Sequence, residues 1–327
     1  MVTAPMRLRW PRPCSTSSGN RAAVSLRSGT EPGGKTMIHE DPVIRVLSDN
    51  YLTVEFGDVI DLRENFRLQA AGRVIDGMKI DGVIEAVPHL RSLGIVFDRA
   101  RTSLDRLRAA VTEALASAES VDRITSRLFR IPVWYDDPFS AALAEHFKVE
   151  NNLEFMAQAN GLTPDEVIAC HTGTDFWIAA VGFVPGCFWA YPLDESKALT
   201  APKYAIPRDR TPSRTVALAG LTTTIYPYPG PGGYQCIGRS AVHLYQARPE
   251  GRDPLFPEDG VLVRPGDRHR YHSVDALEYE AIRERVRSGD YAFDLKEEEI
   301  DVESFLAENE TGGAQNATPR QNVKAVS

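Results

Sequence analysis

The order of apolar periodicities in the first part of the chain is the strongest constraint on its fold. Short strand-like runs alternate there with stretches in which apolar residues recur at helical spacing. The strand-like runs cover residues 43–47, 51–56, 83–87, 93–97 and 128–134, and the helical stretches cover residues 62–78 and 104–115. The first two runs form either two strands or one strand broken near Asp49 and Asn50. The order β-α-β-β-α-β is typical of a split βαβ, ferredoxin-like unit, which we predict over residues 43–130 of an α+β protein.

The following segment changes from helical to β-strand patterns near residue 175. Helical spacing over 139–147 and 153–159 precedes Thr163-Pro164-Asp165-Glu166, a typical helix start with a capping residue, a proline and two acids. Short apolar runs separated by Pro and Gly turns then predict a β-barrel or β-sandwich. These runs cover residues 176–183, 216–219, 222–226 and 234–237, and a charged helix is expected over 275–288. We therefore predict a second domain over 131–306, a β-barrel with a C-terminal helical segment.

The two ends of the chain differ from the rest in composition. Residues 1–36 are rich in Arg, Ser, Gly and Pro and contain a single acid. This indicates a targeting peptide, a disordered arm or a start codon placed too early, and residues 307–327 are expected to be a disordered tail. Residues 29–36 match the GxxxxGK[ST] phosphate-loop pattern, but Pro42 prevents the helix that such a loop requires. We interpret this match as chance.

Composition excludes several classes of function. The net charge of −8 disfavours a nucleic acid partner, because binding to phosphates requires clustered Lys and Arg. The basic cluster Arg268-His269-Arg270 is short, and we interpret it as solvated surface, together with His272. Four cysteines without a CxxC pair indicate neither a zinc site nor a disulfide framework, so no metal site and a reducing, cytoplasmic location are expected.

Two glycine-rich and proline-rich loops, 182–186 and 229–234, mark places where the backbone bends sharply or approaches a ligand closely. Polar residues lie near them in sequence, namely Lys203, Arg208, Tyr226, Gln235 and Arg239. Loops at the rim of a barrel often carry a binding site. Tight barrel corners with surface charges would explain the same pattern equally well.

A series of motifs in this region resembles a known family. The motifs are Gly182 to Gly186, Ala201 to Tyr204 with Pro207-Arg208, Ile225 to Pro227, and Pro231 to Arg239. In this order and spacing they are similar to the carboxyltransferase subdomain C/D family. That family includes allophanate hydrolase subunit 1, the B component of 5-oxoprolinase and the C-terminal part of urea carboxylase. The resemblance covers residues 43–306 and implies a ferredoxin-like domain followed by a cyclophilin-like β-barrel.

Two branches of this family share features with the chain. Residues 151–155 and the segment from Gly289 to Leu306 are similar to the urea-carboxylase branch. The motif at 182–186, the motif at 225–227 and the freestanding length are similar to the 5-oxoprolinase branch. That branch usually has Gln-Thr-Gly before Ile-Tyr-Pro, whereas residues 222–224 are all Thr here. We therefore favour a stand-alone relative of the urea-carboxylase type and keep the B component of 5-oxoprolinase as the alternative.

The resemblance implies an enzyme subunit that transfers a carboxyl group to an amide nitrogen, and it suggests roles for individual residues. Carboxyl transfer requires cations and N–H donors around the developing negative charge. The candidate site residues are Lys203, Arg208 and Arg239 for charge, His171 as a weaker general base, Tyr226, Tyr234 and Gln235 for hydrogen bonds, Asn152 and Glu154 for amide recognition, and Gly232 with Gly233 for close backbone approach.

The resemblance also implies partners. Carboxybiotin would be delivered by a partner carrier, and ATP would be used at the level of the complex. A homologous second carboxyltransferase half, similar to allophanate hydrolase subunit 2, would complete the active cleft. A biotin carboxylase or a LamB-type hydrolase subunit would supply the other activities. A regulatory binding module of the kinase-inhibitor type is a further possibility, because the family includes inhibitors of a sensor kinase.

Overall fold

The computed structural model describes residues 38–118, 122–247, 255–305 and 307. The predictions for residues 1–36, including the phosphate-loop match, and for residues 308–327 lie outside these described ranges. No helix within them is both long enough and apolar enough to cross a membrane.

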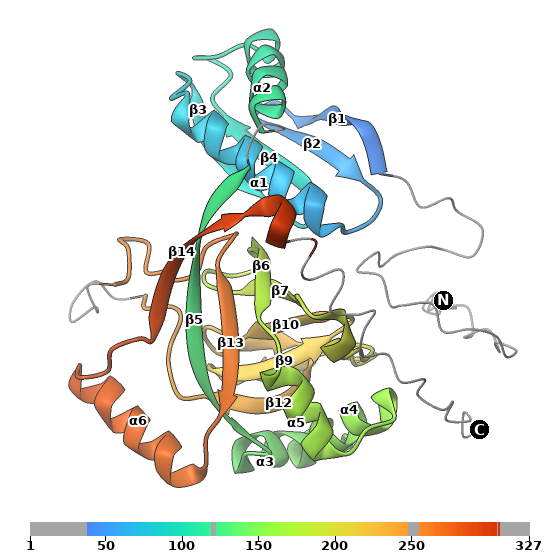
Figure 1. The fold of residues 1–327 in the computed structure, drawn as a ribbon, viewed down its shortest axis with the longest axis vertical. Coiled ribbons are helices and arrows are strands. Elements are labelled where there is room, and N and C mark those ends of the chain that lie inside the picture. The colour runs from blue at the N-terminus through green and yellow to red at the C-terminus, as the bar shows by residue number, and fades with distance from the viewer. Residues whose placement is uncertain (1–37, 119–121, 248–254, 306, 308–327) are drawn as a thin grey trace, which may run out of the picture.

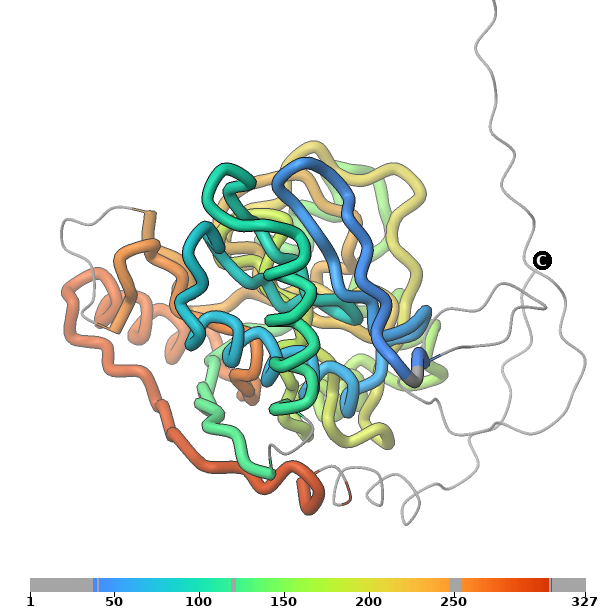
Figure 2. Tube along the Cα trace, turned by 90° about the horizontal axis from the view of Figure 1, so that it is seen from above, coloured from blue at the N-terminus to red at the C-terminus, as the bar shows by residue number. Residues whose placement is uncertain are grey.

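The N-terminal unit is an antiparallel sheet with two helices packed on one face (Figures 1 and 2). Its elements are β1 (Ile38–Ser48), β2 (Tyr51–Gly57), α1 (Leu62–Gly77), β3 (Val83–Pro88), β4 (Ser92–Phe97) and α2 (Leu104–Ala118). The strand order is β1-β2-β4-β3. Alternate residues of the two central strands, such as Leu52, Val54, Leu93 and Ile95, are buried against the helices. This alternation is the period-two pattern of a sheet with one covered face.

The second unit is a closed seven-stranded barrel. Its wall runs in the order β12-β9-β10-β7-β6-β13-β5, and β5 pairs back with β12. The strands are β5 (Arg123–Tyr135), β6 (Phe176–Val181), β7 (Phe188–Pro192), β9 (Thr215–Ala219), β10 (Thr222–Ile225), β12 (Gln235–Ser240) and β13 (Arg268–Ser273). A short ladder of β8 (Arg208–Thr211) and β11 (Gly230–Gly232) lies apart from the wall. The expected α+β architecture with a C-terminal barrel is confirmed.

Strand β5 differs from the sequence-based expectation in its partners. We expected the run 128–134 to complete the first unit, but β5 pairs with β12, β13 and β14 (Leu295–Asp301) in the barrel sheet. The fourth strand of the first sheet is β1 instead, because Ser48 and Tyr51 close a hairpin between β1 and β2. The strand β14 was not anticipated, since its residues 296–299 are all charged.

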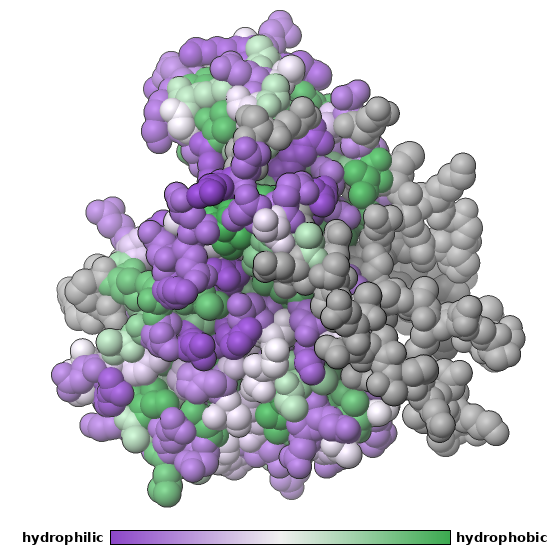
Figure 3. Space-filling view, in the orientation of Figure 1, coloured by the Kyte–Doolittle hydropathy of each residue, from purple (hydrophilic) through white to green (hydrophobic). Residues whose placement is uncertain are grey.

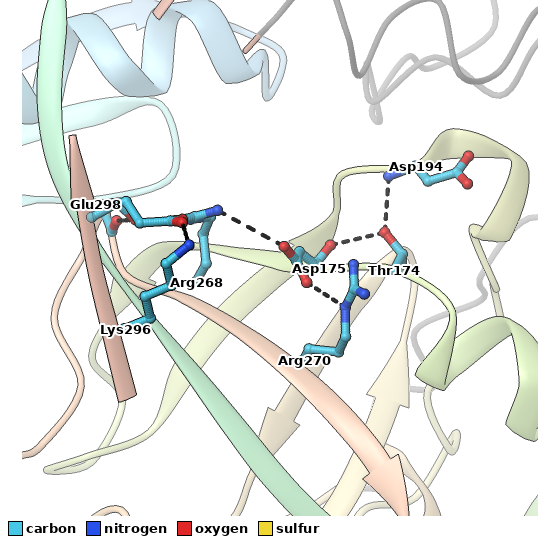
Figure 4. A network of polar contacts seen from close by, with 9 residues as sticks. Thr174, Asp175, Asp194, Arg268, Arg270, Lys296 and Glu298 are labelled. Carbon is cyan, nitrogen blue, oxygen red and sulfur yellow. Dashed lines mark hydrogen bonds and ion pairs between the residues drawn. The ribbon is translucent and has the colours of Figure 1, made fainter. Parts of the chain in front are cut away.

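The interpretation of Arg268-His269-Arg270 as solvated surface is wrong. These residues lie in β13, parallel to β5, where His269 is fully buried and Arg268 nearly so. Arg268 can be buried and Arg270 partly buried because carboxylates meet their charges (Figure 4). Arg268 bonds to Glu298 at 2.6 Å, and Arg270 bonds to Asp175 at 2.5 Å. A basic run can therefore form a barrel strand when neighbouring strands supply acids.

Four helices accompany the barrel: α3 (Pro138–His146), α4 (Asn152–Asn160), α5 (Pro164–Thr172) and α6 (Ala276–Ser288). Thr163 and Glu166 form the capping box of α5 that the sequence predicts. The face drawn in Figure 3 is mainly hydrophilic, with hydrophobic residues in small separate patches. That face therefore presents no extended apolar surface among the described residues.

An apolar cluster joins the two units. Phe66 of α1 stacks on Trp177 of β6 with ring centroids 4.2 Å apart, and Tyr191 and Ile300 belong to the same buried cluster. Asn65 lies beside them and donates from its amide to the carbonyl oxygens of the turn after β3 and of β6. The contact is buried and fully hydrogen-bonded at Asn65, so the units hold a fixed relative position.

Candidate functional site

The wall formed by β9, β10 and β12 separates two different environments. Successive residues of a strand point to opposite faces. Thr222 and Thr224 of β10 point outward, where their hydroxyls meet the Tyr234 hydroxyl at 3.1 Å and the Cys187 thiol at 3.5 Å. Thr223 points into the barrel and meets His171 Nε2 at 3.1 Å. The candidate residues are therefore divided between the outer face of the wall and the barrel interior.

Most candidate residues gather on the outer face, in a group that we call the outer-wall cluster: Asn152, Lys203, Tyr204, Arg208, Tyr226, Gly232, Gly233, Tyr234 and Cys236. Arg208 is its centre and is 3% exposed. Its Nη2 donates to the carbonyl oxygen of Tyr234 at 2.6 Å, and its Nε donates to the Thr211 hydroxyl at 3.2 Å. The guanidinium carbon lies 4.9 Å from the ring centroid of Tyr204. Arg208 is thus held in place by the ring of Tyr204, the backbone of Tyr234 and the hydroxyl of Thr211.

Gly232 allows Tyr226 to reach this cluster. The β8–β11 ladder pairs Gly232 with Arg208, and a Cβ atom at residue 232 would overlap the Tyr226 hydroxyl. Burial raises the pKa of Tyr226 to about 12, and burial also raises the pKa of Tyr234. Both hydroxyls are therefore protonated near pH 7, and the Tyr234 hydroxyl donates its proton to Thr222, which itself donates to the Ala219 carbonyl oxygen.

Asn152 holds the cluster together from α4. Its Oδ1 accepts a hydrogen bond from the backbone N–H of Cys236, and its Nδ2 donates to the Tyr204 hydroxyl and to the carbonyl oxygen of Glu150. Because these protein groups occupy its amide, Asn152 positions Tyr204 and β12 in this structure. Glu154, two residues later, is exposed on α4.

Lys203 borders the cluster, whereas Gln235 points to the barrel side of the wall, because it pairs with Leu218 of the barrel core. The ammonium of Lys203 lies 5.2 Å from the centroid of the Tyr234 ring, and the side chain is exposed. Gln235 is buried and donates from Nε2 to the carbonyl oxygen of Pro202 at 2.8 Å. Its Oε1 is buried without a partner among the described residues. Gln235 therefore does not join the outer-wall cluster.

His171 does not join the cluster, because it lies inside the barrel. Its Nδ1 is 2.7 Å from the Tyr135 hydroxyl, and its ring stacks on Tyr271 with centroids 4.3 Å apart. Burial lowers its pKa to about 3. The β10 backbone separates this histidine from Tyr234. The geometry indicates a structural residue in the barrel core.

Arg239 lies near the C-terminal end of β12, whereas Arg208 binds the carbonyl of Tyr234, just before the N-terminal end of that strand. A register shift in β12 between Cys236 and Gly238 turns Arg239 outward, where its guanidinium lies 4.4 Å from the ring centroid of Phe139. Four residues separate Arg239 from Gln235, which is about 13 Å along a strand. The two arginines therefore do not converge on one small group.

Sequence reasoning missed two aromatic residues beside the cluster. Trp189 of β7 makes a side-chain hydrogen bond with Tyr234, and its ring lies 5.7 Å from the ring of His89. His89 belongs to the N-terminal unit, immediately after β3. Burial lowers its pKa, so its ring is neutral near pH 7. No local pattern around Pro88 could have indicated that this histidine reaches the barrel. The described ranges contain no group of three His, Cys, Asp or Glu residues that could hold a metal ion.

This chain belongs to the class of proteins in which an antiparallel sheet with two helices precedes a closed seven-stranded barrel. Residues 42–255 match the family described as carboxyltransferase domain, subdomain C and D. The chain belongs to this family, which confirms the resemblance seen in the sequence.

Relatives and solved structures agree with this assignment. The chain is 29% identical to the B component of 5-oxoprolinase from Bacillus subtilis over 251 residues, covering 74% of this chain and 96% of that protein. It is 25% identical to urea amidolyase of Saccharomyces cerevisiae over 277 residues, covering 81% of this chain but only 15% of that protein. The structure of the Kluyveromyces lactis urea carboxylase aligns with a TM-score of 0.73 at 22% identity, covering 84% of this chain and 26% of that one. At that identity the likeness shows the fold alone.

Proposed function

We propose that this chain is a carboxyltransferase-type subunit of a multi-subunit, biotin-dependent urea or amide carboxylase, and that its outer-wall cluster takes part in carboxylating an amide nitrogen. The observation that carries the proposal is that Arg208 lies over the Tyr204 ring and binds the backbone carbonyl of Tyr234, while Lys203 lies over the face of the Tyr234 ring. This arrangement places two cations and several protonated hydroxyls on one wall of the barrel. Such a group stabilises developing negative charge on a carboxylate or an amide oxygen.

Each residue has a role that its contacts allow. Arg208 uses Nε and Nη2 to bind the protein, so its Nη1 is the part of the fork left for a ligand oxygen. Lys203 is exposed and supplies a mobile charge at the edge of the cluster. The hydroxyl of Tyr226 donates a hydrogen bond to the substrate, and Tyr234 places its ring beneath the ammonium of Lys203. Asn152 positions Tyr204.

Carboxybiotin, arriving on a carrier of a partner subunit, would supply the carboxyl group. The residues present fit such a group, because the cluster carries the cations Lys203 and Arg208 beside protonated tyrosine hydroxyls. One Met-Lys pair, the dipeptide typical of biotin-acceptor sites, does occur in this chain, at Met78-Lys79. Met78 caps the C-terminal end of α1 and Lys79 follows it, directly after the helix. A streptavidin blot of the purified chain is expected to be negative, and a positive blot would place the carrier on this chain.

The proposal is tested by reconstituting the chain with a homologous second half, a biotin carboxylase and a biotin carrier. We expect ATP-dependent incorporation of labelled bicarbonate that requires both this chain and urea or another amide. A complex that assembles but incorporates no label with any amide would contradict the proposal.

A second candidate is a subunit of an ATP-dependent lactam hydrolase that acts on 5-oxoproline. It is favoured by the match along 96% of the Bacillus subtilis 5-oxoprolinase component, a freestanding chain of similar extent. The same reconstitution with a second half and a LamB-type subunit distinguishes the candidates, because release of glutamate from 5-oxoproline without bicarbonate supports only the lactam hydrolase.

A further inference from the structure

Three arginines converge at the end of the barrel farthest along β12 from the outer-wall cluster. Arg214, which precedes β9, donates from Nη1 to the carbonyl oxygen of Ser240 at 2.9 Å and to the Tyr279 hydroxyl at 2.6 Å. Arg283 of α6 donates from Nη1 to the carbonyl oxygen of Ala241 at 2.8 Å. Arg239 directly precedes Ser240 in β12. Three separate elements therefore bring guanidinium groups to one short segment.

The positive charges of these arginines are poorly compensated. None of the three forms an ion pair with a carboxylate in the part of the chain that the structure describes, whereas Arg287 on the same helix as Arg283 pairs with Glu284 at 2.7 Å. Glu280 is exposed and acts on Arg214 only through space. Asp137 lies near Arg239, but its carboxylate accepts hydrogen bonds from the first turn of α3 and is buried. These three arginines therefore lack compensating negative charge among the described residues.

Burial and mutual repulsion oppose the charged forms of these side chains. Burial and the repulsion of Arg214 lower the pKa of Arg283 to about 10. Burial and the charges of Arg214, Arg283 and Arg239 lower the pKa of His243 to about 4, so its ring is neutral near pH 7. Like charges are thus held together against their mutual repulsion.

Two further features indicate that these three arginines can bind a ligand. Arg214 has a backbone φ of 66°, a left-handed conformation that costs a side-chain-bearing residue about 1 kcal/mol. The backbone hydrogen bonds from Arg214 N to Tyr226 O and from Ser240 N to Arg214 O hold it there. The Nε atom of Arg239 is buried without a hydrogen-bond partner among the described residues. Strain, repulsion and an unpaired donor occur together at one place.

We propose that Arg214, Arg239 and Arg283, with His243, form a binding site for a small oxyanion, a phosphate or carboxylate group, separate from the outer-wall cluster. The planar forks of arginine suit the oxygens of either group. The neutral imidazole supplies one further hydrogen bond. Binding requires neither a partner subunit nor turnover, so its test is independent of the proposed carboxylation.

The test measures the melting temperature of the purified chain in sodium phosphate, in sodium malonate and in sodium chloride of equal ionic strength. Phosphate or malonate at ten times its Kd should raise Tm by about 3 °C relative to chloride. A larger response to phosphate identifies the preferred group as a phosphate, and a larger response to malonate identifies it as a carboxylate. Equal Tm in all three salts would overturn the proposal.

Matched variants locate the site. Arg214→Gly suits the left-handed backbone but leaves the buried Ser240 carbonyl and Tyr279 hydroxyl without this partner, so its Tm in chloride should fall by a few degrees. Measured against its own Tm in chloride, the variant should bind the anion at least tenfold more weakly. Arg283→Ala removes the bond to the Ala241 carbonyl but relieves the repulsion from Arg214, so it should fold and should also weaken anion binding at least tenfold. Arg287→Ala removes an equal charge from the same helix and should keep the full response. An anion response retained in Arg214→Gly and Arg283→Ala, or lost equally in Arg287→Ala, would show only general screening by salt.

Discussion

The side-chain oxygen of Asn65 accepts a hydrogen bond from the indole N–H of Trp177 at 2.9 Å, and both side chains are fully buried. Asn65 belongs to the N-terminal unit and Trp177 to the barrel, so this bond crosses the junction between them. The amide of Asn65 also binds the carbonyl oxygen of His89. One side chain therefore fixes both the junction and the position of the histidine next to Trp189 and the outer-wall cluster.

Asn65→Ala is expected to destabilise the protein by about 2–4 kcal/mol, because it leaves the Trp177 indole and several carbonyl oxygens buried without partners. Asn50→Ala in the exposed β1–β2 turn removes only a bond to Ser48 and should cost less than about 1 kcal/mol. Urea denaturation of both variants measures the difference. Equal small losses would show that the junction tolerates unpaired groups.

Gly232→Ala is expected to destabilise the protein by about 1–3 kcal/mol, because the new Cβ would overlap the Tyr226 hydroxyl. Gly230→Ala in the same strand meets no atom within 4 Å and should change stability by less than about 0.5 kcal/mol. Adding Tyr226→Phe to Gly232→Ala should recover part of the loss, since it removes the hydroxyl. A double-mutant cycle from thermal unfolding tests this, and strictly additive effects would contradict the overlap.

Arg208→Lys is expected to lower kcat/KM of the reconstituted complex about tenfold, because lysine keeps the charge but loses the planar fork. Arg210→Lys, an exposed arginine on the same strand, is the matched control and should keep normal activity. Tm measured on both variants separates a loss of function from a loss of folding, since Arg208 is buried. Full activity in a folded Arg208→Lys variant would remove Arg208 from the proposed site.

Stability is expected to decrease as the pH falls below about 6.5, because His171 and His269 are buried in neutral form. Burial lowers the pKa of each to about 3, whereas the unfolded chain protonates histidine near 6.5. Between these values the unfolded state binds more protons, so each histidine adds about 1.4 kcal/mol per pH unit to the slope of stability against pH.

His269→Leu should reduce that slope between about pH 4 and 6, by roughly the contribution of one histidine. Both ring nitrogens of His269 lack partners among the described residues, so this variant loses no protein hydrogen bond. His146→Gln, at an exposed position on α3, is the control and should leave the slope unchanged. An unchanged slope in His269→Leu would show that His269 is accessible to protons in the folded protein.

Sequence reasoning succeeded where the determining interactions are local. The helix start at Thr163 and Glu166 and the alternating strands of the first sheet follow from neighbouring residues alone. It failed for β13, because the burial of Arg268 depends on Glu298, 30 residues later in the sequence. Tyr204, Arg208 and Tyr234 belong to the motifs that suggested the site, and the structure brings them together. The position of His171 inside the barrel could not be predicted in this way, because it depends on which threonine of β10 points inward.

The pairing of β5 has a consequence for the order in which the chain can fold during synthesis. The sheet of the first unit is complete once residue 97 has been made, and α2 follows it directly. The barrel, in contrast, needs β12, β13 and β14 as neighbours of β5, and the last of these ends at Asp301. Contacts of such long sequence separation form slowly. On the ribosome, the first unit can therefore be compact while β5 still lacks every partner, and protease digestion of nascent chains arrested near residue 230 should leave only that unit intact.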